Sequence, residues 1–319
     1  MNRTRTDPPT HWQHLQDEGR HLPSELGRRE QETRDLLLPL FLNASRLGRK
    51  KLQFIRRPAQ GLCPQRPCTT SHLHIEVGET WLQQVFFSFE TPEAMLDKLT
   101  NIPTATRSLI RHARVSGELL MLSWPEGSVY YRTFQTLKLL PGLALDRLTV
   151  LGPRAREVRY ETLDTLVRYG IGWKELYYLS HDSAFLAYEH DWFSAVYLRV
   201  PQPAGWQRAL NTRDGPASGA SVVIYRAITP RSPGAVLHPA TRVTFAQTLP
   251  AGSDLLTFGK VADSALMAPG EREKEVLVVV KRGGGLDHTE KEGSPYLDDG
   301  DIREVMPGMT WKQITAELA

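Results

Sequence analysis

Apolar and polar residues change their spacing repeatedly along the middle of the chain. Runs in which apolar residues alternate with polar ones, or follow one another over a few positions, predict β-strands. Such runs cover residues 73–77, 85–89, 109–115, 145–150, 173–179, 222–228 and 275–281. Apolar residues that recur every three or four positions predict helices, at residues 92–102, 130–140, 163–167, 243–249 and 311–318. The alternation of the two patterns predicts an α/β protein.

One helix start is marked by three consecutive residues. Thr91 has the hydroxyl of a helix N-cap, and Pro92 fits the first helical position because no backbone N–H is needed there. Glu93 places a negative charge in the first turn, where the helix dipole favours it. We therefore expect a helix to begin directly after Thr91. Thr310 is expected to cap the last helix in the same way.

Three of the predicted strands resemble one another. Residues 110–117, 145–152 and 173–180 share an opening of the form apolar–polar–polar–apolar and an apolar second half, and their starts are 35 and 28 residues apart. Strand–helix units that recur at such intervals are typical of repeat proteins. The pattern therefore predicts a degenerate leucine-rich-repeat-like strand–helix array. The alternative is an ordinary open α/β sheet with helices on both faces.

Composition along the chain suggests three parts. Residues 1–33 are polar and contain few branched apolar residues, which predicts a disordered N-terminal arm. Residues 34–200 form the expected α/β repeat-like domain. Residues 201–221 hold six prolines and glycines and are interpreted as a linker or long loop. Residues 201–319 as a whole are predicted to form a C-terminal α+β region that closes the open end of the array.

Several segments resemble those of a known group of proteins. The segments are Phe134–Gly142, Leu145–Gly152, Gly172–Ser180 and Arg272–Gly283. They are similar to segments of a large group of uncharacterised filamentous-fungal proteins, some of which begin with an F-box and continue with leucine-rich-like repeats. The resemblance covers roughly residues 70–315 and implies the fold but no activity. It does not extend to the F-box, because Leu36–Leu52 lacks the hydrophobic spacing with which that motif docks its adaptor.

Composition and charge exclude several classes of protein. The chain has 319 residues, of which 40% are hydrophobic and 24% charged, and its net charge is +3. These values are ordinary for a folded domain and exclude collagen and disulfide mini-proteins. No apolar run reaches the ~18–20 residues that span a bilayer, and no apolar segment lies near the start. We therefore expect a cytoplasmic or nuclear protein that is neither secreted nor bound to a membrane.

Charged residues are distributed unevenly. Residues 43–66 hold seven basic and no acidic residues, whereas residues 285–304 are mainly acidic. Between Arg46 and Arg57, apolar residues are interleaved with the cations. We interpret this stretch as a packed segment with a solvated basic face, because long basic side chains can extend over apolar neighbours. No RNA-binding fingerprint accompanies it, so binding to nucleic acid is not expected.

Two clusters contain residue types that are able to support chemistry. Cys63, Cys68, His72 and His74 together offer the ligands that zinc prefers, but their spacing matches no known zinc module, and no metal is expected. Ser180, His181, Asp182 and Ser183 contain the residue types of a hydrolase triad. Adjacent side chains diverge, whereas a triad must converge in space. We therefore interpret Asp182 or Ser183 as the N-cap of a helix that begins at Ala184.

The strongest catalytic alternative is an ADP-ribosyltransferase. Arg226 lies on a predicted strand, and Glu273 and Glu275 form a Glu-x-Glu pair before another strand. Both local patterns look similar to those with which ADP-ribosyltransferases hold NAD and stabilise an oxocarbenium-like transition state. The Ser-Thr-Ser element of that family is absent between them. The competing interpretation is a structural Arg–Glu pair.

We favour a protein that is not an enzyme and has no cofactor. The predicted array would present a surface to a protein partner, as repeat proteins do. Trp, Tyr and Arg contribute most of the binding energy at protein interfaces. Trp124, Trp192 and Trp206 lie near predicted loops and are therefore the predicted anchors. For each of them the alternative is a tryptophan in the core.

Overall fold

The structure is a computed structural model, and it describes most of the last three quarters of the chain. The described residues are 79–124, 127–187, 200–248, 266, 268–291, 302 and 308–317. All of them belong to one compact unit, Cys68–Ala319. The N-terminal arm, the basic stretch, the predicted strand at 73–77 and the candidate zinc ligands lie outside the described residues.

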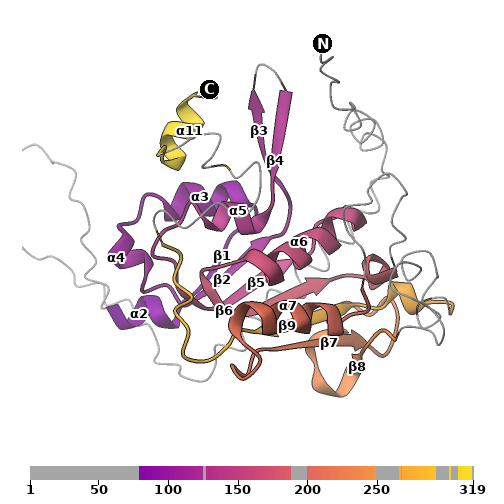
Figure 1. Ribbon diagram of the computed structural model, residues 1–319. Coiled ribbons are helices and arrows are strands. Elements are labelled where there is room, and N and C mark those ends of the chain that lie inside the picture. Colours follow the sequence, from indigo (N-terminus) through magenta and orange to yellow (C-terminus); the bar gives the residue numbers. More distant parts are fainter. Residues whose placement is uncertain are drawn as a thin grey trace, which may run out of the picture. The chain divides into compact units, whose positions relative to one another are not determined.

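Seven strands form one mixed sheet (Figure 1). In spatial order they are β1 (Phe86–Ser88), β2 (His112–Ser116), β5 (Leu145–Leu151), β6 (Trp173–Ser180), β9 (Val276–Lys281), β7 (Ser221–Ala227) and β8 (Arg242–Phe245). The first four are parallel and follow one another in chain order. The last three join by antiparallel pairing. A strand from the last quarter of the chain therefore lies in the middle of the sheet, beside β6.

The longer helices cover one face of this sheet. They are α3 (Pro92–Leu99), α6 (Arg156–Tyr169) and α7 (Ala204–Asp214). The shorter α5 (Thr133–Leu137) adds buried residues to the same core, and α11 (Trp311–Glu317) packs against α3, where Trp311 Nε1 donates to Asp97 Oδ1. Figure 1 shows α6 and α7 lying across the strands. Their apolar side chains share one core with alternate strand residues, among them Val150, Tyr178, Ile224 and Val278. Two short helices, α2 (Glu79–Gln84) and α4 (Thr104–Arg107), flank α3 in sequence.

The opposite face of the sheet has a smaller apolar cluster at one end. Leu179, Ala227, Leu277 and Val279 contribute to it from three strands, and Val236 covers them. Val236 lies in η5 (Ala235–Leu237), a short 3-10 helix, which η6 (Pro239–Thr241) connects to β8. Further along the same strands, this face has polar and charged residues, among them Arg147, Glu175 and Lys281.

Most of the predicted strands and the predicted start of α3 are confirmed. Thr91 Oγ1 accepts a hydrogen bond from the backbone N–H of Ala94 at 3.1 Å, and Pro92 is the first helical residue. At the other end of the chain, Thr310 Oγ1 accepts a 3.4 Å hydrogen bond from the N–H of Gln313. Both caps were predictable because an N-cap satisfies donors of its own first turn and needs no distant partner.

Three predictions of local structure are wrong. Residues 130–140 were expected to form one helix, but the first of them end strand β4 (Gly127–Tyr131) and the helix begins at Thr133. Residues 243–249 were also expected to be helical, but Arg242–Phe245 form β8, because they pair with β7 at the sheet edge. Residues 201–221 were interpreted as a linker, but they contain helix α7, whose residues Trp206 and Leu210 are buried four positions apart.

The mixed α/β class of the prediction is confirmed. The strand order gives no support to a leucine-rich-repeat arrangement, because β9, β7 and β8 are antiparallel additions that do not follow chain order. The alternative with helices on both faces does not fit the described residues either, since the longer helices pack on one face. The boundary predicted at residue 200 runs through this sheet. None of the helices in the described part of the chain is long and apolar enough to cross a membrane.

Candidate binding surfaces

A shallow trough of about 420 Å³ lies where β2, β5 and β6 begin and β9 ends. Among the described residues, its charged side chains are Asp146, Arg147, Lys174, Glu175, Lys281 and Arg282. The sheet register places four lining residues side by side on neighbouring strands, in the order His112, Arg147, Glu175 and Lys281. These four continue the face opposite the longer helices, because side chains alternate between the faces along a strand.

One carboxylate is shared between two cations in the trough. Glu175 Oε2 lies 3.6 Å from Arg147 Nη2, and Glu175 Oε1 lies 3.3 Å from Lys281 Nζ. Both distances exceed the 2.7–2.9 Å that charge-assisted hydrogen bonds usually have. The side chains of Arg147 and Lys281 are 45% and 55% exposed. Both cations therefore remain accessible to solvent.

Two further contacts hold the charged groups in place. The guanidinium carbon of Arg147 lies 4.3 Å from the centre of the Tyr177 ring, so the side chain is stacked on the sheet. Lys174 Nζ lies 2.7 Å from Asp146 Oδ1 and neutralises it.

Burial and the nearby charge of Arg147 lower the pKa of His112. At neutral pH His112 therefore adds no charge to the trough.

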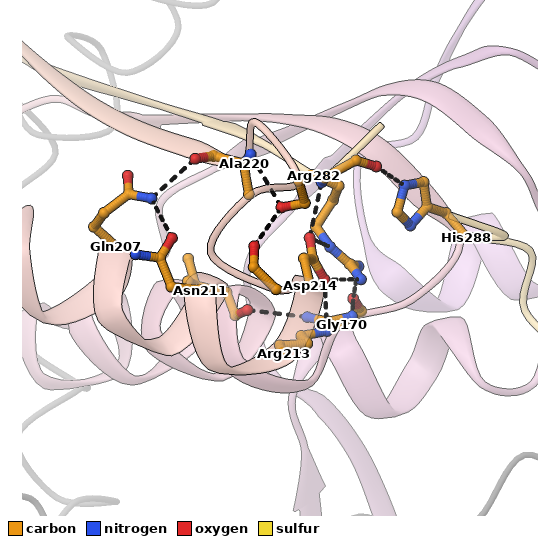
Figure 2. A network of polar contacts seen from close by, with 12 residues as sticks. Gly170, Gln207, Asn211, Arg213, Asp214, Ala220, Arg282 and His288 are labelled. Atoms are coloured by element: carbon orange, nitrogen blue, oxygen red, sulfur yellow. Dashed lines mark hydrogen bonds and ion pairs between the residues drawn. The ribbon is translucent and has the colours of Figure 1, made fainter. Parts of the chain in front are cut away.

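A buried ion pair forms the wall of the trough beside β9 (Figure 2). Arg282 donates from Nε to Asp214 Oδ2 at 2.7 Å and from Nη2 to Asp214 Oδ1 at 2.8 Å. The N–H of Gly283 also donates to Asp214 Oδ2, at 2.9 Å, and Arg282 Nη1 donates to the carbonyl of Gly170 at 3.2 Å. Burial alone would raise the pKa of Asp214, but these donors lower it. Arg282 is thereby fixed and largely neutralised.

The same network connects α7 to its surroundings. Arg213 donates to the carbonyls of Val167 at 2.9 Å and of Gly170. Gln207 donates to Ala220 O at 2.9 Å, as Figure 2 shows, and its Oε1 accepts from the N–H of Val222 at 2.9 Å. The end of α7, the loop after α6 and the start of β7 are thus held together by side chains. The trough therefore has a rigid wall.

A second surface is the hairpin of β3 (Leu120–Trp124) and β4 (Gly127–Tyr131), which form their own two-stranded sheet. Figure 1 shows it extending away from the main sheet. Seven large hydrophobic residues are exposed among the described residues, and three of them lie on this hairpin. They are Met121, Val129 and Tyr130, which are 50%, 39% and 39% exposed. Neither strand has a charged residue.

The base of the hairpin is anchored in the main core. Leu120 and Leu122 alternate with the exposed Met121 and are buried, and Tyr131 at the end of β4 is fully buried. The register pairs Met121 with Tyr130, so these two exposed side chains lie next to each other on one face, whereas Val129 pairs with Leu122 on the other face. One face of the hairpin is therefore an apolar surface on a fixed support.

The three predicted tryptophan anchors have different outcomes. Trp206 is fully buried and donates from Nε1 to Asp164 Oδ1 at 2.9 Å, so the prediction that it contacts a partner is wrong. Trp124 is the last residue of β3 and pairs with Gly127, but its side chain lies outside the described residues. Trp192 lies outside them entirely. The sequence did not distinguish Trp206 because helix α7 was missed.

The residues of the predicted transferase site do not converge. Arg226 is on the face of β7 that carries the main core, where it stacks 4.4 Å over the ring of Phe245 and forms a 2.5 Å ion pair with Glu271. Glu275 precedes β9 and points to the other face, towards η5. Glu273 forms an ion pair with the exposed Arg231. The competing interpretation, a structural Arg–Glu pair, describes Arg226, although its partner is Glu271.

Glu275 has a structural role that its position explains. Its carboxylate is buried and accepts hydrogen bonds from the N–H groups of Gly234 at 2.9 Å and Val236 at 3.4 Å. Burial raises the pKa of Glu275, and the backbone donors oppose that shift only in part. Glu275 thus attaches η5 to the sheet. The sequence did not indicate this role, because the donors are about 40 residues away in the chain.

The capping interpretation of the Ser-His-Asp-Ser run is confirmed. Asp182 Oδ1 accepts from the N–H of Ala184 at 3.0 Å, at the start of η3 (Ala184–Ala187). The hydroxyls of Ser180 and Ser183 donate to the backbone carbonyls of Asp182 and Glu271. Neither hydroxyl is therefore directed at His181, and the run does not form a catalytic triad.

In the part of the chain that the structure describes, no group of three or more His, Cys, Asp or Glu side chains is arranged to hold a metal ion. Comparison of the chain with family models, with curated proteins and with solved structures finds no match. The function is therefore argued from the two surfaces themselves.

Sequence reasoning missed the trough although a signal was present. Arg147, Glu175 and Lys281 are charged residues within or at the end of strands that are otherwise mostly apolar. A charged residue on a strand indicates a solvent-facing position. That signal does not reveal which strands are neighbours, and β9 lies next to β6 although 95 residues separate Ser180 from Val276.

Proposed function

We propose that this protein is a non-enzymatic protein-interaction scaffold that binds a protein partner with the β3–β4 hairpin. The observation that carries the proposal is the concentration of exposed apolar side chains there. Three of the seven large hydrophobic residues that are exposed in the described part of the chain lie on ten uncharged strand positions, and Met121 and Tyr130 share one face. Contiguous exposed apolar surface is costly in water and commonly marks an interaction site.

The position of the hairpin supports a role in binding. It is inserted between β2 and α5, in the crossover that leads to β5. Because Leu120, Leu122 and Tyr131 are fixed in the core, little conformational entropy is lost when Met121 and Tyr130 contact a partner. Trp124, at the tip of β3, is the proposed additional anchor.

The test compares two double substitutions. In M121K/Y130K, two cations replace the apolar pair on the hairpin. In the matched control I228K/V243K, two cations replace Ile228 and Val243, which are 48% and 49% exposed but lie near β7 and β8. Surface substitutions of this kind usually change stability by less than about 0.5 kcal/mol. Circular dichroism would verify that both variants are folded.

Each protein would be used for affinity purification from the cells that produce it. We expect wild type and I228K/V243K to retain a stoichiometric protein partner, and M121K/Y130K to retain at least tenfold less. Loss of a desolvated aromatic contact of about 2 kcal/mol would have an effect of that size. Recovery of no stoichiometric partner, or equal recovery with both variants, would overturn the proposal.

A further inference from the structure

The trough has features that the hairpin proposal does not use. It is polar, it lies on the face opposite the longer helices, and it has two accessible cations on one row of the sheet. We propose that the trough binds an acidic polypeptide segment, with one carboxylate of the segment on Arg147 and a second on Lys281. This proposal stands independently of the hairpin.

The charges of the described residues that line the trough do not balance. Among the described residues, Asp146 is paired with Lys174, and Arg282 with the buried Asp214. Arg147, Lys281 and Glu175 remain, which leaves one excess positive charge. An Arg has five N–H donors and a Lys three, and the shared Glu175 accepts from each of these two cations only at 3.3–3.6 Å. Donors therefore remain for the carboxylates of a ligand.

The distance between the two cations suits a peptide with acidic residues three positions apart. Arg147 is on β5 and Lys281 on β9, with Glu175 of β6 between them. Neighbouring strands lie about 4.8 Å apart, so the two backbones are roughly 10 Å apart. In a peptide with the extended polyproline II backbone, which has three residues per turn, residues three positions apart lie on the same face and are separated by about 9 Å. Two acidic residues at positions i and i+3 would therefore reach Arg147 and Lys281 together.

The central carboxylate of the trough favours a polypeptide over a nucleic acid. Glu175 lies between the two cations and repels a negative charge placed above it. A nucleic-acid strand has a phosphate at every nucleotide, about 3.4 Å apart along the helix axis. Such a continuous row of charge would meet Glu175. A peptide is able to place an uncharged residue at that point and acidic residues on both sides.

Contacts within the protein hold two arginine side chains of the trough in place. Arg147 is stacked on Tyr177, and Arg282 in the wall is fixed by Asp214 and Gly170. Arginine held in a planar stack loses less freedom when it binds a carboxylate than a freely rotating side chain would. The trough therefore has its cations in place before a ligand arrives.

The probe for the test is a fluorescein-labelled extended peptide with two Glu-Gly-Gly-Glu units, and fluorescence anisotropy is the measurement. The trough variant is R147E/K281E. The matched control is K98E/K312E, which has the same net charge and changes exposed lysines on α3 and α11. We expect R147E/K281E to bind at least tenfold more weakly than wild type, and K98E/K312E to bind within twofold of wild type.

A third variant tests the role of the central carboxylate. Glu175→Gln removes the negative charge between the cations, and we expect it to bind the peptide severalfold more tightly than wild type. A merely nonspecific attraction of an acidic peptide to a basic protein would be weakened equally in R147E/K281E and K98E/K312E. That result, or no binding of the peptide by wild type at low salt, would overturn the proposal.

The same titrations with a single-stranded oligonucleotide of equal charge test whether the trough binds nucleic acid in preference to a polypeptide. We expect weaker binding of the oligonucleotide than of the peptide. If the oligonucleotide binds more tightly and only R147E/K281E loses it, the trough is a nucleic-acid site and the proposal is wrong. None of these substitutions touches the hairpin. A negative result for the trough therefore leaves the scaffold proposal unaffected, and a negative result for the hairpin leaves the trough proposal unaffected.

Discussion

Asp182 connects three parts of the molecule through one carboxylate. It caps η3 through the N–H of Ala184, and its Oδ2 lies 2.7 Å from Arg159 Nη1 and 2.9 Å from His181 Nε2. Burial would raise the pKa of Asp182, but the hydrogen bond from His181 and the charge of Arg159 outweigh burial and lower this pKa to about 2. The ionised carboxylate therefore stabilises the folded state.

We expect Asp182→Asn to lower the free energy of unfolding by about 2 kcal/mol at pH 7. The pKa is lower in the folded protein than the value near 3.9 in the unfolded chain. The stabilisation is therefore present above about pH 4 and is lost as the pH falls from about 4 towards 2. Urea denaturation of both proteins at several pH values measures this difference.

The control for this prediction is Asp146→Asn, which removes an exposed ion pair with Lys174. Exposed pairs contribute about 0–1 kcal/mol, so this variant should unfold almost like wild type. A D182N variant as stable as wild type at pH 7, or a difference that does not shrink in acid, would contradict the assignment.

Trp206 illustrates why the sequence does not predict whether a single tryptophan is buried or exposed at an interface. Its side chain donates to Asp164, which is 42 positions earlier in the chain and also accepts from Arg168. A tryptophan has the same chemistry at an interface and in a core. The sequence around Trp206 contains nothing that identifies Asp164 as its partner, so burial became evident only in the folded chain.

Local signals were sufficient for helix α3. Its cap, its proline and its apolar stripe all lie within one continuous segment, and Met95, Leu96 and Leu99 are buried as the spacing indicated. By contrast, Arg242–Phe245 were expected to be helical, but they form β8 by pairing with β7, from which η5 and η6 separate them along the chain. A strand at a sheet edge is stabilised by its neighbour, which short-range periodicity does not show.

We expect Thr91→Ala to destabilise the protein by about 1 kcal/mol, because the N–H of Ala94 loses its hydrogen-bond acceptor. Thr91→Ser retains a hydroxyl at the same position and should cost less than about 0.5 kcal/mol. Urea denaturation gives both values, and amide exchange at Ala94 should be faster in the alanine variant only. Equal losses in the two variants would show that the cap contributes nothing.

The buried pair of Asp214 and Arg282 holds the molecule together across a long stretch of chain. Asp214 ends α7, Arg282 follows β9, and Arg282 also donates to Gly170 after α6. Both charged side chains are almost completely buried. Removing one partner would leave the other charged and without compensation, which is far more costly than the loss of a surface pair.

We expect Asp214→Leu and Arg282→Met each to destabilise the protein by about 3–5 kcal/mol. In the double variant, no buried charge is left unpaired, so its loss should be at least about 2 kcal/mol smaller than the sum of the two single losses. Chemical denaturation of the four proteins of this cycle measures the coupling. Additive losses within about 0.5 kcal/mol would contradict a direct interaction between the two charges.

The sequence by itself determined what depends on neighbouring residues. It identified the α/β class, six of the seven strands of the sheet at close to their final positions from apolar runs, and the caps at Thr91 and Asp182, since these features are satisfied within a few residues. Only the tertiary structure decided which strands are neighbours. It placed β9 between β6 and β7, separated Arg226 from Glu275 on opposite faces, and aligned Arg147, Glu175 and Lys281 in one row. The physical reason is that pairing between distant strands depends on the burial of apolar surface by the whole sheet, which no single segment encodes.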